Sequence, residues 1–194
     1  KSIQKLFTDA DCIFFTGGDQ SRIVDIIGDT PVHDIIFNRL KNEKIVLSGT
    51  SAGAMSMSEE MIMGGSSIEC LTKGSVKMRN GMGYIPSMII DSHFVNRGRF
   101  GRLAEAVARF PQLIGVGLAE DTGLVIKNEE FKVIGSGMVI VFDPSNLSHN
   151  NYGILDDGLP MSMTDLTTHI LADGDCFYMD KRTIKVYPME EYIS

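Results

Sequence analysis

The stretch at 49–53 reads Gly-Thr-Ser-Ala-Gly and matches the pattern G-x-S-x-G, which is typical of serines that act as nucleophiles. Small residues on either side of Ser51 allow a sharp turn from a strand into a helix, and such a turn exposes the serine hydroxyl. The apolar residues at 45–47 predict the strand, and a segment rich in Ala and Met follows the turn. Ser51 is therefore the candidate nucleophile. Small residues also serve close packing of a strand against a helix, so the motif needs partners.

His93 is the candidate base for this serine, because an activated serine needs a base within hydrogen-bond reach. Its segment, Asp-Ser-His-Phe, directly follows an apolar run at 88–90 that predicts a buried strand. The imidazole should then lie at the carboxyl edge of the sheet, where Ser51 also lies. The remaining histidines have ordinary structural explanations, and these are His33, His149 and His169.

Glu120 is the candidate third member of the group. It ends another predicted strand, at 114–118, and so reaches the same edge of the sheet. A carboxylate there would fix the tautomer of His93 and stabilise its protonated form. Asp121 is the alternative for this role. Each polar residue at a strand end also serves as a cap or turn former, and their joint placement favours the catalytic interpretation.

A short basic segment contributes three guanidinium groups, from Arg97, Arg99 and Arg102, in a chain with a net charge of −7. They predict a local anion site, because guanidinium groups bind carboxylates in a bidentate manner. Asp91 beside them could receive a cationic part of the same substrate. The alternative is a solvated helix start whose arginines pair with residues such as Glu105.

A glycine pair precedes Asp and Gln in the stretch at 17–20. Glycines let backbone amides approach a ligand closely, so the amides of this pair, together with the amide of Ala52, could form an oxyanion hole. The alternatives are a plain strand-to-helix turn and a weak phosphate loop, and the pattern G-x-G-x-x-G is absent.

The elements that must position these residues follow from hydrophobic pattern and capping chemistry. Asp19 is placed to cap a helix that ends before Gly28, and Thr30-Pro31 opens a second helix. Continuous apolar strands that alternate with helices predict a mostly parallel sheet with helices on both faces. The predicted strands are 12–16, 45–47, 88–90 and 114–118, and a later helix is predicted at 101–110.

The C-terminal third is predicted to be rich in antiparallel strands. Apolar runs at 124–126 and 131–134 flank a polar turn and predict a hairpin, and a second hairpin is centred on 180–182. No internal repeat or linker marks a boundary, so residues 1–194 are expected to form a single domain.

Composition limits the function classes. The chain has 194 residues, of which 43% are hydrophobic, and its net charge of −7 argues against a broad surface for nucleic acid or an anionic membrane. No apolar run reaches the roughly 18 residues that cross a bilayer. The cysteines are Cys12, Cys70 and Cys176, and their wide spacing predicts neither a disulfide framework nor a zinc site.

Four motifs lie in order along about two thirds of the chain: Gly-Gly-Asp-Gln at 17–20; Gly-Thr-Ser-Ala-Gly-Ala at 49–54; Asp91-x-His93-Phe94 with Arg97, Arg99 and Arg102; and Gly117-x-x-Glu120-Asp121. Together they resemble the cyanophycinase family, serine peptidases akin to the α-aspartyl dipeptidases. The resemblance implies a flavodoxin-like α/β fold similar to class I glutamine amidotransferases, and a catalytic triad of Ser51, His93 and Glu120. It also implies an oxyanion hole at Gly18 and Ala52, and substrate binding by Gln20, Asp91, Ser92, Arg97, Arg99 and Arg102.

Cyanophycinases hydrolyse cyanophycin, a polyaspartate that carries arginine on each side-chain carboxyl, and release β-aspartyl-arginine dipeptides. The resemblance therefore implies a peptide or polymer substrate, an acyl-enzyme on Ser51, and no metal or cofactor. It also suggests a homodimer. A cytoplasmic location is expected, and a secreted one stays open because a signal peptide would precede the residues given.

Two features depart from the family. Ser92 stands where cyanophycinases typically carry Gln, which predicts an altered contact to the substrate. The family also carries βα units before the strand at 12–16, so we expect this chain to be a fragment or the ordered part of a longer protein. Without those units, the sheet would expose an edge next to the nucleophile strand. The competing hypotheses are an aspartyl or isoaspartyl dipeptidase and a catalytically silent member of the fold. A glutaminase would need Cys at the position of Ser51.

Overall fold

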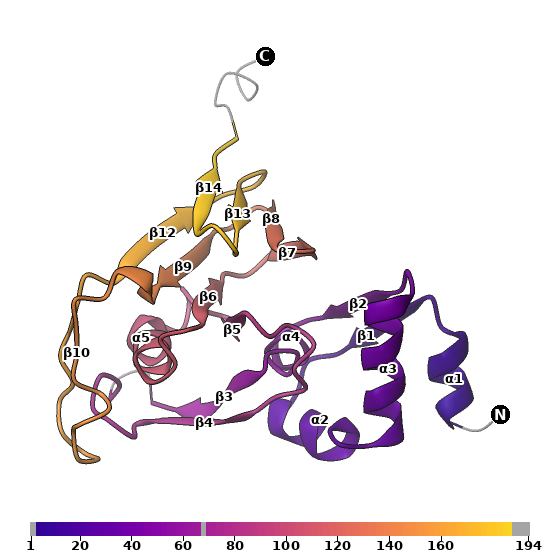
Figure 1. Ribbon diagram of the computed structural model, residues 1–194, viewed down its shortest axis with the longest axis horizontal. Coiled ribbons are helices and arrows are strands. Elements are labelled where there is room, and N and C mark those ends of the chain that lie inside the picture. Colours follow the sequence, from indigo (N-terminus) through magenta and orange to yellow (C-terminus); the bar gives the residue numbers. More distant parts are fainter. Residues whose placement is uncertain (1–2, 67–68, 188–194) are drawn as a thin grey trace.

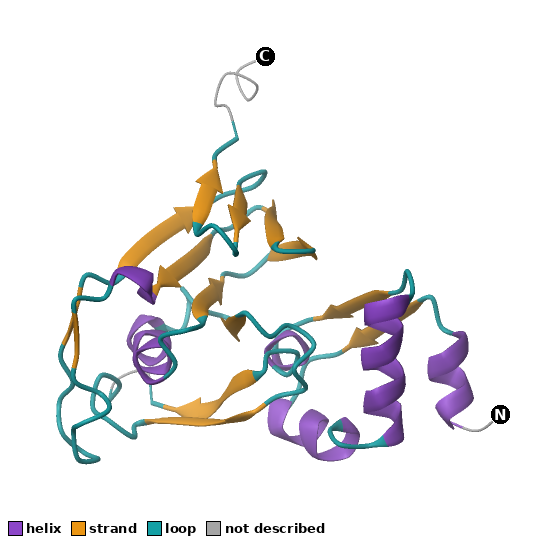
Figure 2. Cartoon of the chain, in the orientation of Figure 1, coloured by secondary structure: helices purple, strands orange, loops and turns teal. Residues whose placement is uncertain are grey.

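The computed structural model describes residues 3–66 and 69–187, which form a mixed α/β fold (Figure 1). The first half of the chain contains both helices and strands, and strands dominate the second half (Figure 2). The first elements are α1 (Ile3–Asp9), β1 (Cys12–Phe15), α2 (Gln20–Ile27), α3 (Pro31–Asn42) and β2 (Val46–Gly49).

Local capping chemistry sets the ends of the first two long helices. The Asp19 side chain accepts hydrogen bonds from the amides of Ser21 and Arg22 at the start of α2, and the Gly28 amide closes its last turn. Thr30 caps α3, whose first residue is Pro31. These helix starts were predicted from the sequence and are confirmed.

β1 and β2 form a separate parallel pair in which Phe15 lies opposite Gly49. The prediction that this first strand is buried on both faces is wrong: Ile13 and Phe15 are buried, whereas Phe14 is 56% exposed. The alternation shows that only one face of β1 is covered, so the apolar run forms a half-buried strand.

The middle of the chain crosses to a second group of elements. These are α4 (Ala52–Met55), β3 (Glu60–Gly65), β4 (Val76–Asn80), β5 (Met88–Asp91), α5 (Phe100–Arg109) and β6 (Ile114–Leu118). β3 and β4 form an antiparallel hairpin, and β5 runs parallel to β6. α5 packs on β6 at Gly115, where a Cβ atom would lie 2.7 Å from a Val107 methyl group.

The last third contains short strands, as predicted. They are β7 (Thr122–Lys127), β8 (Glu130–Gly135), β9 (Val139–Asp143), β10 (His149–Asn150), β11 (Met163–Thr164), β12 (Thr167–Leu171), β13 (Cys176–Tyr178) and β14 (Thr183–Lys185), with a 3₁₀ turn, η1 (Pro144–Asn146). The predicted hairpins are confirmed as the antiparallel pairs β7–β8 and β13–β14.

The strands do not form the continuous, mostly parallel sheet that the sequence predicts. One sheet has the order β12-β9-β6-β5, in which only β5–β6 is parallel, and a second has the antiparallel order β14-β13-β8-β7. The β1–β2 pair stands apart from both sheets (Figure 1). The parallel arrangement is interrupted because, among the described residues, β2 has a strand partner on one side only.

A cavity of about 720 Å³ lies along the other edge of β2, and we call it the β2 cleft. It runs from the start of the strand at Val46 to Ser51 beyond its end. Its opposite wall comes from the end of β5, from β6 and from β7. Apolar side chains line much of it, including Leu47, Tyr84, Ile85, Leu118 and Leu124.

One hydrophobic cluster nevertheless joins the two groups of elements. It includes Ile13 of β1, Met55 of α4, Ile90 of β5, Val116 of β6 and Phe177 of β13. Within 3–66 and 69–187, no helix has both the length and the apolar character to cross a membrane.

Candidate active site

Ser51 lies at a sharp turn between β2 and α4. Its φ of 51° and ψ of −118° place it outside the ordinary regions for an L residue, as expected for a serine at a strand-to-helix elbow. The turn needs Gly53, because a Cβ atom there would lie 2.1 Å from the Phe15 carbonyl oxygen of β1. The close approach of the turn to β1 thus depends on a missing side chain.

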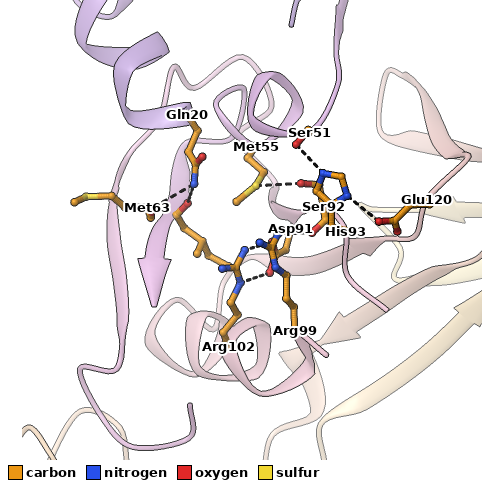
Figure 3. A network of polar contacts seen from close by, with 11 residues as sticks. Gln20, Ser51, Met55, Met63, Asp91, Ser92, His93, Arg99, Arg102 and Glu120 are labelled. Atoms are coloured by element: carbon orange, nitrogen blue, oxygen red, sulfur yellow. Dashed lines mark hydrogen bonds and ion pairs between the residues drawn. The ribbon is translucent and has the colours of Figure 1, made fainter. Parts of the chain in front are cut away.

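His93 follows β5 and turns its ring toward this serine (Figure 3). The ring nitrogen Nε2 is 3.0 Å from Ser51 Oγ. His93 has a φ of 52°, so this second strand end also carries a left-handed residue.

Glu120 follows β6, and its Oε1 is 2.8 Å from Nδ1 of His93. The two side chains meet because β5 and β6 are parallel neighbours whose carboxyl ends lie together. The hydrogen bond from His93 lowers the pKa of the Glu120 carboxyl group. Among the described contacts it is Glu120, and not Asp121, that bonds the imidazole.

The geometry permits nucleophilic chemistry. When Nδ1–H of His93 donates to Glu120, the lone pair of Nε2 is left to accept the hydroxyl proton of Ser51. The serine oxygen then gains nucleophilic character, and the carboxylate stabilises the imidazolium that forms. This chain of two hydrogen bonds can activate Ser51 for attack on a carbonyl carbon.

A small cavity of about 240 Å³ lies beside the serine, and we call it the arginine pocket. Gly18 and Ala52, the two expected oxyanion-hole positions, line it together with Ser51. Ala52 is the first residue of α4, so its amide has no partner within the helix. Gly17 also lies against the serine, since a Cβ atom there would be 3.5 Å from Ser51 Cβ.

The basic segment divides into buried and exposed arginines, all three of which line the arginine pocket. Arg102 is 5% exposed and donates from Nε to Asp91 Oδ2 over 2.6 Å. Arg99 donates to Asp91 Oδ1 over 3.2 Å and to the Ser92 carbonyl over 2.5 Å. Arg97 is exposed. The carboxylate of Asp91 is thus bonded inside the protein rather than open to a ligand.

Gln20 and Ser92, the two remaining expected binding residues, also line the arginine pocket. The amide nitrogen of Gln20 donates to the carbonyl oxygens of Ile62 (2.9 Å) and Met63 (3.2 Å), so Gln20 ties α2 to β3. The Ser92 hydroxyl is buried and lies 3.4 Å from the Met55 sulfur (Figure 3).

Met55 and Met63 line the same pocket and were not predicted from the sequence. Met63 lies on β3, and the sequence pattern at 60–65 did not predict a strand. The methionine-rich composition of 55–63 was the available signal, because flexible methionine side chains often line binding surfaces.

Comparisons with known proteins found a peptidase family and several relatives. The family described as peptidase family S51 matches residues 1–134. The chain is 42% identical over 173 residues to a cyanophycinase of Trichormus variabilis, a match that covers 89% of this chain and 58% of the relative. It is 40% identical over 176 residues to a cyanophycinase of Geminocystis herdmanii, covering 90% of this chain and 65% of the relative.

One solved structure resembles this chain in its fold. A peptidase from an acI-B1 Actinobacterium superposes with a TM-score of 0.54 at 23% identity, covering 86% of this chain and 62% of that one. The chain thus spans less than two thirds of the length of each of these proteins.

Proposed function

The chain belongs to peptidase family S51, and from that premise we propose that it is the catalytic part of a serine peptidase that hydrolyses cyanophycin. The observation that carries the proposal is the continuous hydrogen-bonded series from Ser51 through His93 to Glu120. Both hydrogen bonds lie within the distance that proton transfer between a nucleophile and its base requires.

The reaction starts with attack of Ser51 Oγ on the carbonyl carbon of a backbone amide. Nε2 of His93 takes the hydroxyl proton as the bond to carbon forms, and Glu120 stabilises the imidazolium. The amides of Ala52 and Gly18 stabilise the negative charge on the former carbonyl oxygen. His93 then gives its proton to the leaving nitrogen as the C–N bond breaks. A water molecule attacks the acyl-enzyme in the same way and regenerates the free serine.

The arginine pocket supports an anionic group on the substrate. Arg97 is exposed and lines the same cavity as Ser51, in a chain whose net charge is −7. A guanidinium binds a carboxylate in a planar, bidentate manner, and every unit of cyanophycin carries one free carboxylate. Gln20 forms the neighbouring wall and shapes the pocket through its bonds to β3.

The test is release of β-aspartyl-arginine from insoluble cyanophycin, run beside Ser51→Ala and with isoaspartyl dipeptides as competing substrates. Release that falls by about 10³-fold or more in the variant supports both nucleophile and substrate. Cleavage of dipeptides alone would retain the triad and shift the substrate to that of an isoaspartyl dipeptidase, with Ser92 as the first residue to examine. Absence of any Ser51-dependent hydrolysis would favour a catalytically silent protein.

We also propose that residues 1–194 are one peptidase domain with a flavodoxin-like, amidotransferase-like sheet, which further strands complete in the β2 cleft. One strand residue between packed layers occupies about 160 Å³, from its rise and the spacings between strands and layers. The cleft of about 720 Å³ therefore holds a strand of about four or five residues. β2 itself has four residues.

Amide exchange tests this completion. Val46 and Thr50 donate toward β1, so the amides between them at Leu47 and Gly49 point toward the cleft. In a longer form that carries the leading βα units of the family, these two amides should exchange at least about 100-fold more slowly than in residues 1–194. Equal exchange rates would contradict a strand in the cleft. We also propose that the longer form is a homodimer, and analytical ultracentrifugation of that form would test this.

A further inference from the structure

The backbone of His93 adopts a strained conformation, which neighbouring groups must stabilise. Its φ of 52° lies in the left-handed region, which costs free energy for a residue with a Cβ atom. The ring nevertheless makes two hydrogen bonds, to Ser51 and to Glu120. A rotation of the backbone at His93 would swing the ring away from one of them. The groups that fix this turn therefore decide whether the base reaches the serine.

The turn is fixed on its amino-terminal side by Arg99. Its Nη1 donates to the carbonyl oxygen of Ser92 over 2.5 Å. That oxygen belongs to the peptide plane between Ser92 and His93, and the orientation of this plane sets φ of His93. On the carboxyl-terminal side, the amide of Phe94 donates to the Leu118 carbonyl of β6 over 3.0 Å. Both peptide planes that flank the histidine are thus held.

Asp91 holds Arg99 in place and is itself fixed by Arg102. The Asp91 side chain is fully buried, and its Oδ1 accepts from Arg99 while its Oδ2 accepts from Arg102 over 2.6 Å (Figure 3). Burial lowers the pKa of the Arg99 guanidinium, and the Asp91 carboxylate opposes this change. Because Asp91 pairs with two guanidinium groups inside the protein, its carboxylate serves the protein rather than a ligand.

The exposed arginine behaves differently. Arg97 lies on the same loop, its side chain is open to solvent, and it lines the arginine pocket. Its amide donates to the His93 carbonyl over 3.2 Å, a backbone bond that substitution of the side chain leaves in place. Arg97 therefore provides a matched contrast on the same segment.

We propose that Arg99 is a positioning residue, which acts on His93 through the carbonyl group of Ser92 and is itself held by Asp91, which Arg102 fixes in turn. The inference rests on the proposed function, because it assigns Arg99 a part in the reaction at Ser51. The three arginines then have different roles. Arg97 binds the substrate, whereas Arg99 and Arg102 keep the imidazole of His93 in position.

The first readout does not depend on activity. In protein labelled with ¹⁵N-histidine, the Nδ1–H proton that His93 shares with Glu120 should give a far-downfield NMR resonance, assigned by its loss in His93→Ala. We expect Arg99→Ala to abolish or shift this resonance and Arg97→Ala to preserve it. Arg99→Lys should restore part of it, because an ammonium group can reach the Ser92 carbonyl but lacks the planar geometry of the guanidinium.

The second readout is the division between kcat and KM on the cleaved substrate. Arg99→Ala should lower kcat by about 100-fold with KM little changed, as expected for a base displaced by about 1 Å. Arg97→Ala should raise KM by about tenfold or more and leave kcat nearly unchanged.

The outcomes separate the two proposals. If cyanophycin is not cleaved but the His93 resonance responds to Arg99→Ala, the proposed function fails and the positioning role stands. An unchanged resonance in Arg99→Ala overturns the positioning role, as does a rise in KM alone. Absence of the resonance from the unaltered protein also overturns it, because the ring would then not be held against Glu120.

Discussion

Replacing Gly53 with alanine tests whether the contact between the serine turn and β1 positions Ser51. The new Cβ atom would lie 2.1 Å from the Phe15 carbonyl oxygen, a distance that must grow to at least 3.0 Å. That oxygen accepts the amide of Thr50 over 3.1 Å. Moving it away would stretch this hydrogen bond to about 4 Å, beyond hydrogen-bond range.

The size of the effect follows from these two changes. Loss of the hydrogen bond costs about 1 kcal/mol, and overpacking of the turn costs about 1–3 kcal/mol. We therefore expect Gly53→Ala to lower the free energy of unfolding by about 2–4 kcal/mol. A displacement of the serine by about 1 Å should also lower kcat by about 100-fold.

Urea denaturation measures the first quantity, and steady-state hydrolysis measures the second. Gly153→Ala is the matched control, because a Cβ atom at Gly153 meets nothing within 4 Å and the backbone there is not left-handed. If Gly53→Ala matched the control in both measurements, the close contact between the turn and β1 would be irrelevant to stability and to the position of Ser51.

Three further predictions concern carboxylates. Glu120→Gln should lower kcat by about 10³–10⁴-fold, because an amide cannot stabilise the imidazolium, and a loss below tenfold in steady-state hydrolysis would contradict that role. Glu105 is 1% exposed and accepts hydrogen bonds from the amides of Gly74 and Val76. Burial raises the pKa of its carboxyl group. The stabilising contribution of Glu105 is therefore present at low pH and is lost as the pH rises through that raised pKa. Urea titrations from about pH 4 to pH 8 should therefore show Glu105→Gln gaining stability relative to the unaltered protein as the pH rises, and a constant difference would refute this. Asp19→Ala removes the cap of α2 and should cost about 0.5–2 kcal/mol in the same assay, whereas no change would mean that the cap contributes nothing.

Local chemistry explains which parts of the fold could be predicted. Asp19 and Thr30 mark helix starts because a cap acts within three residues of itself. His93 and Glu120 could be assigned to one edge because each directly follows an apolar strand, and parallel strands end at the same edge. The structure brings both to Ser51, and their catalytic role is the proposal that kinetics must test.

Features that depend on distant contacts could not be predicted. The exposure of Phe14 depends on which elements cover β1, and no property of its own segment reports that. The hairpin of β3 and β4 lacks a clear alternation of apolar residues, so its methionines suggested no strand. The role of Asp91 could not be predicted either, because the sequence does not show whether a carboxylate near arginines is buried with them or open to a ligand.

The open edge of β2 has a consequence for how the chain behaves at high concentration. Among the described residues β2 pairs only with β1, and an unpaired strand edge attracts strands from other molecules. Val46 of β2 (59% exposed) and Phe14 of the neighbouring β1 (56% exposed) make the surface of this strand pair apolar. Self-association through β2 would produce oligomers unrelated to the homodimer that the resemblance suggests. A lysine at Val46 would discourage such strand addition. Light scattering of the unaltered protein and of Val46→Lys would then distinguish aggregation through β2 from assembly of a specific dimer.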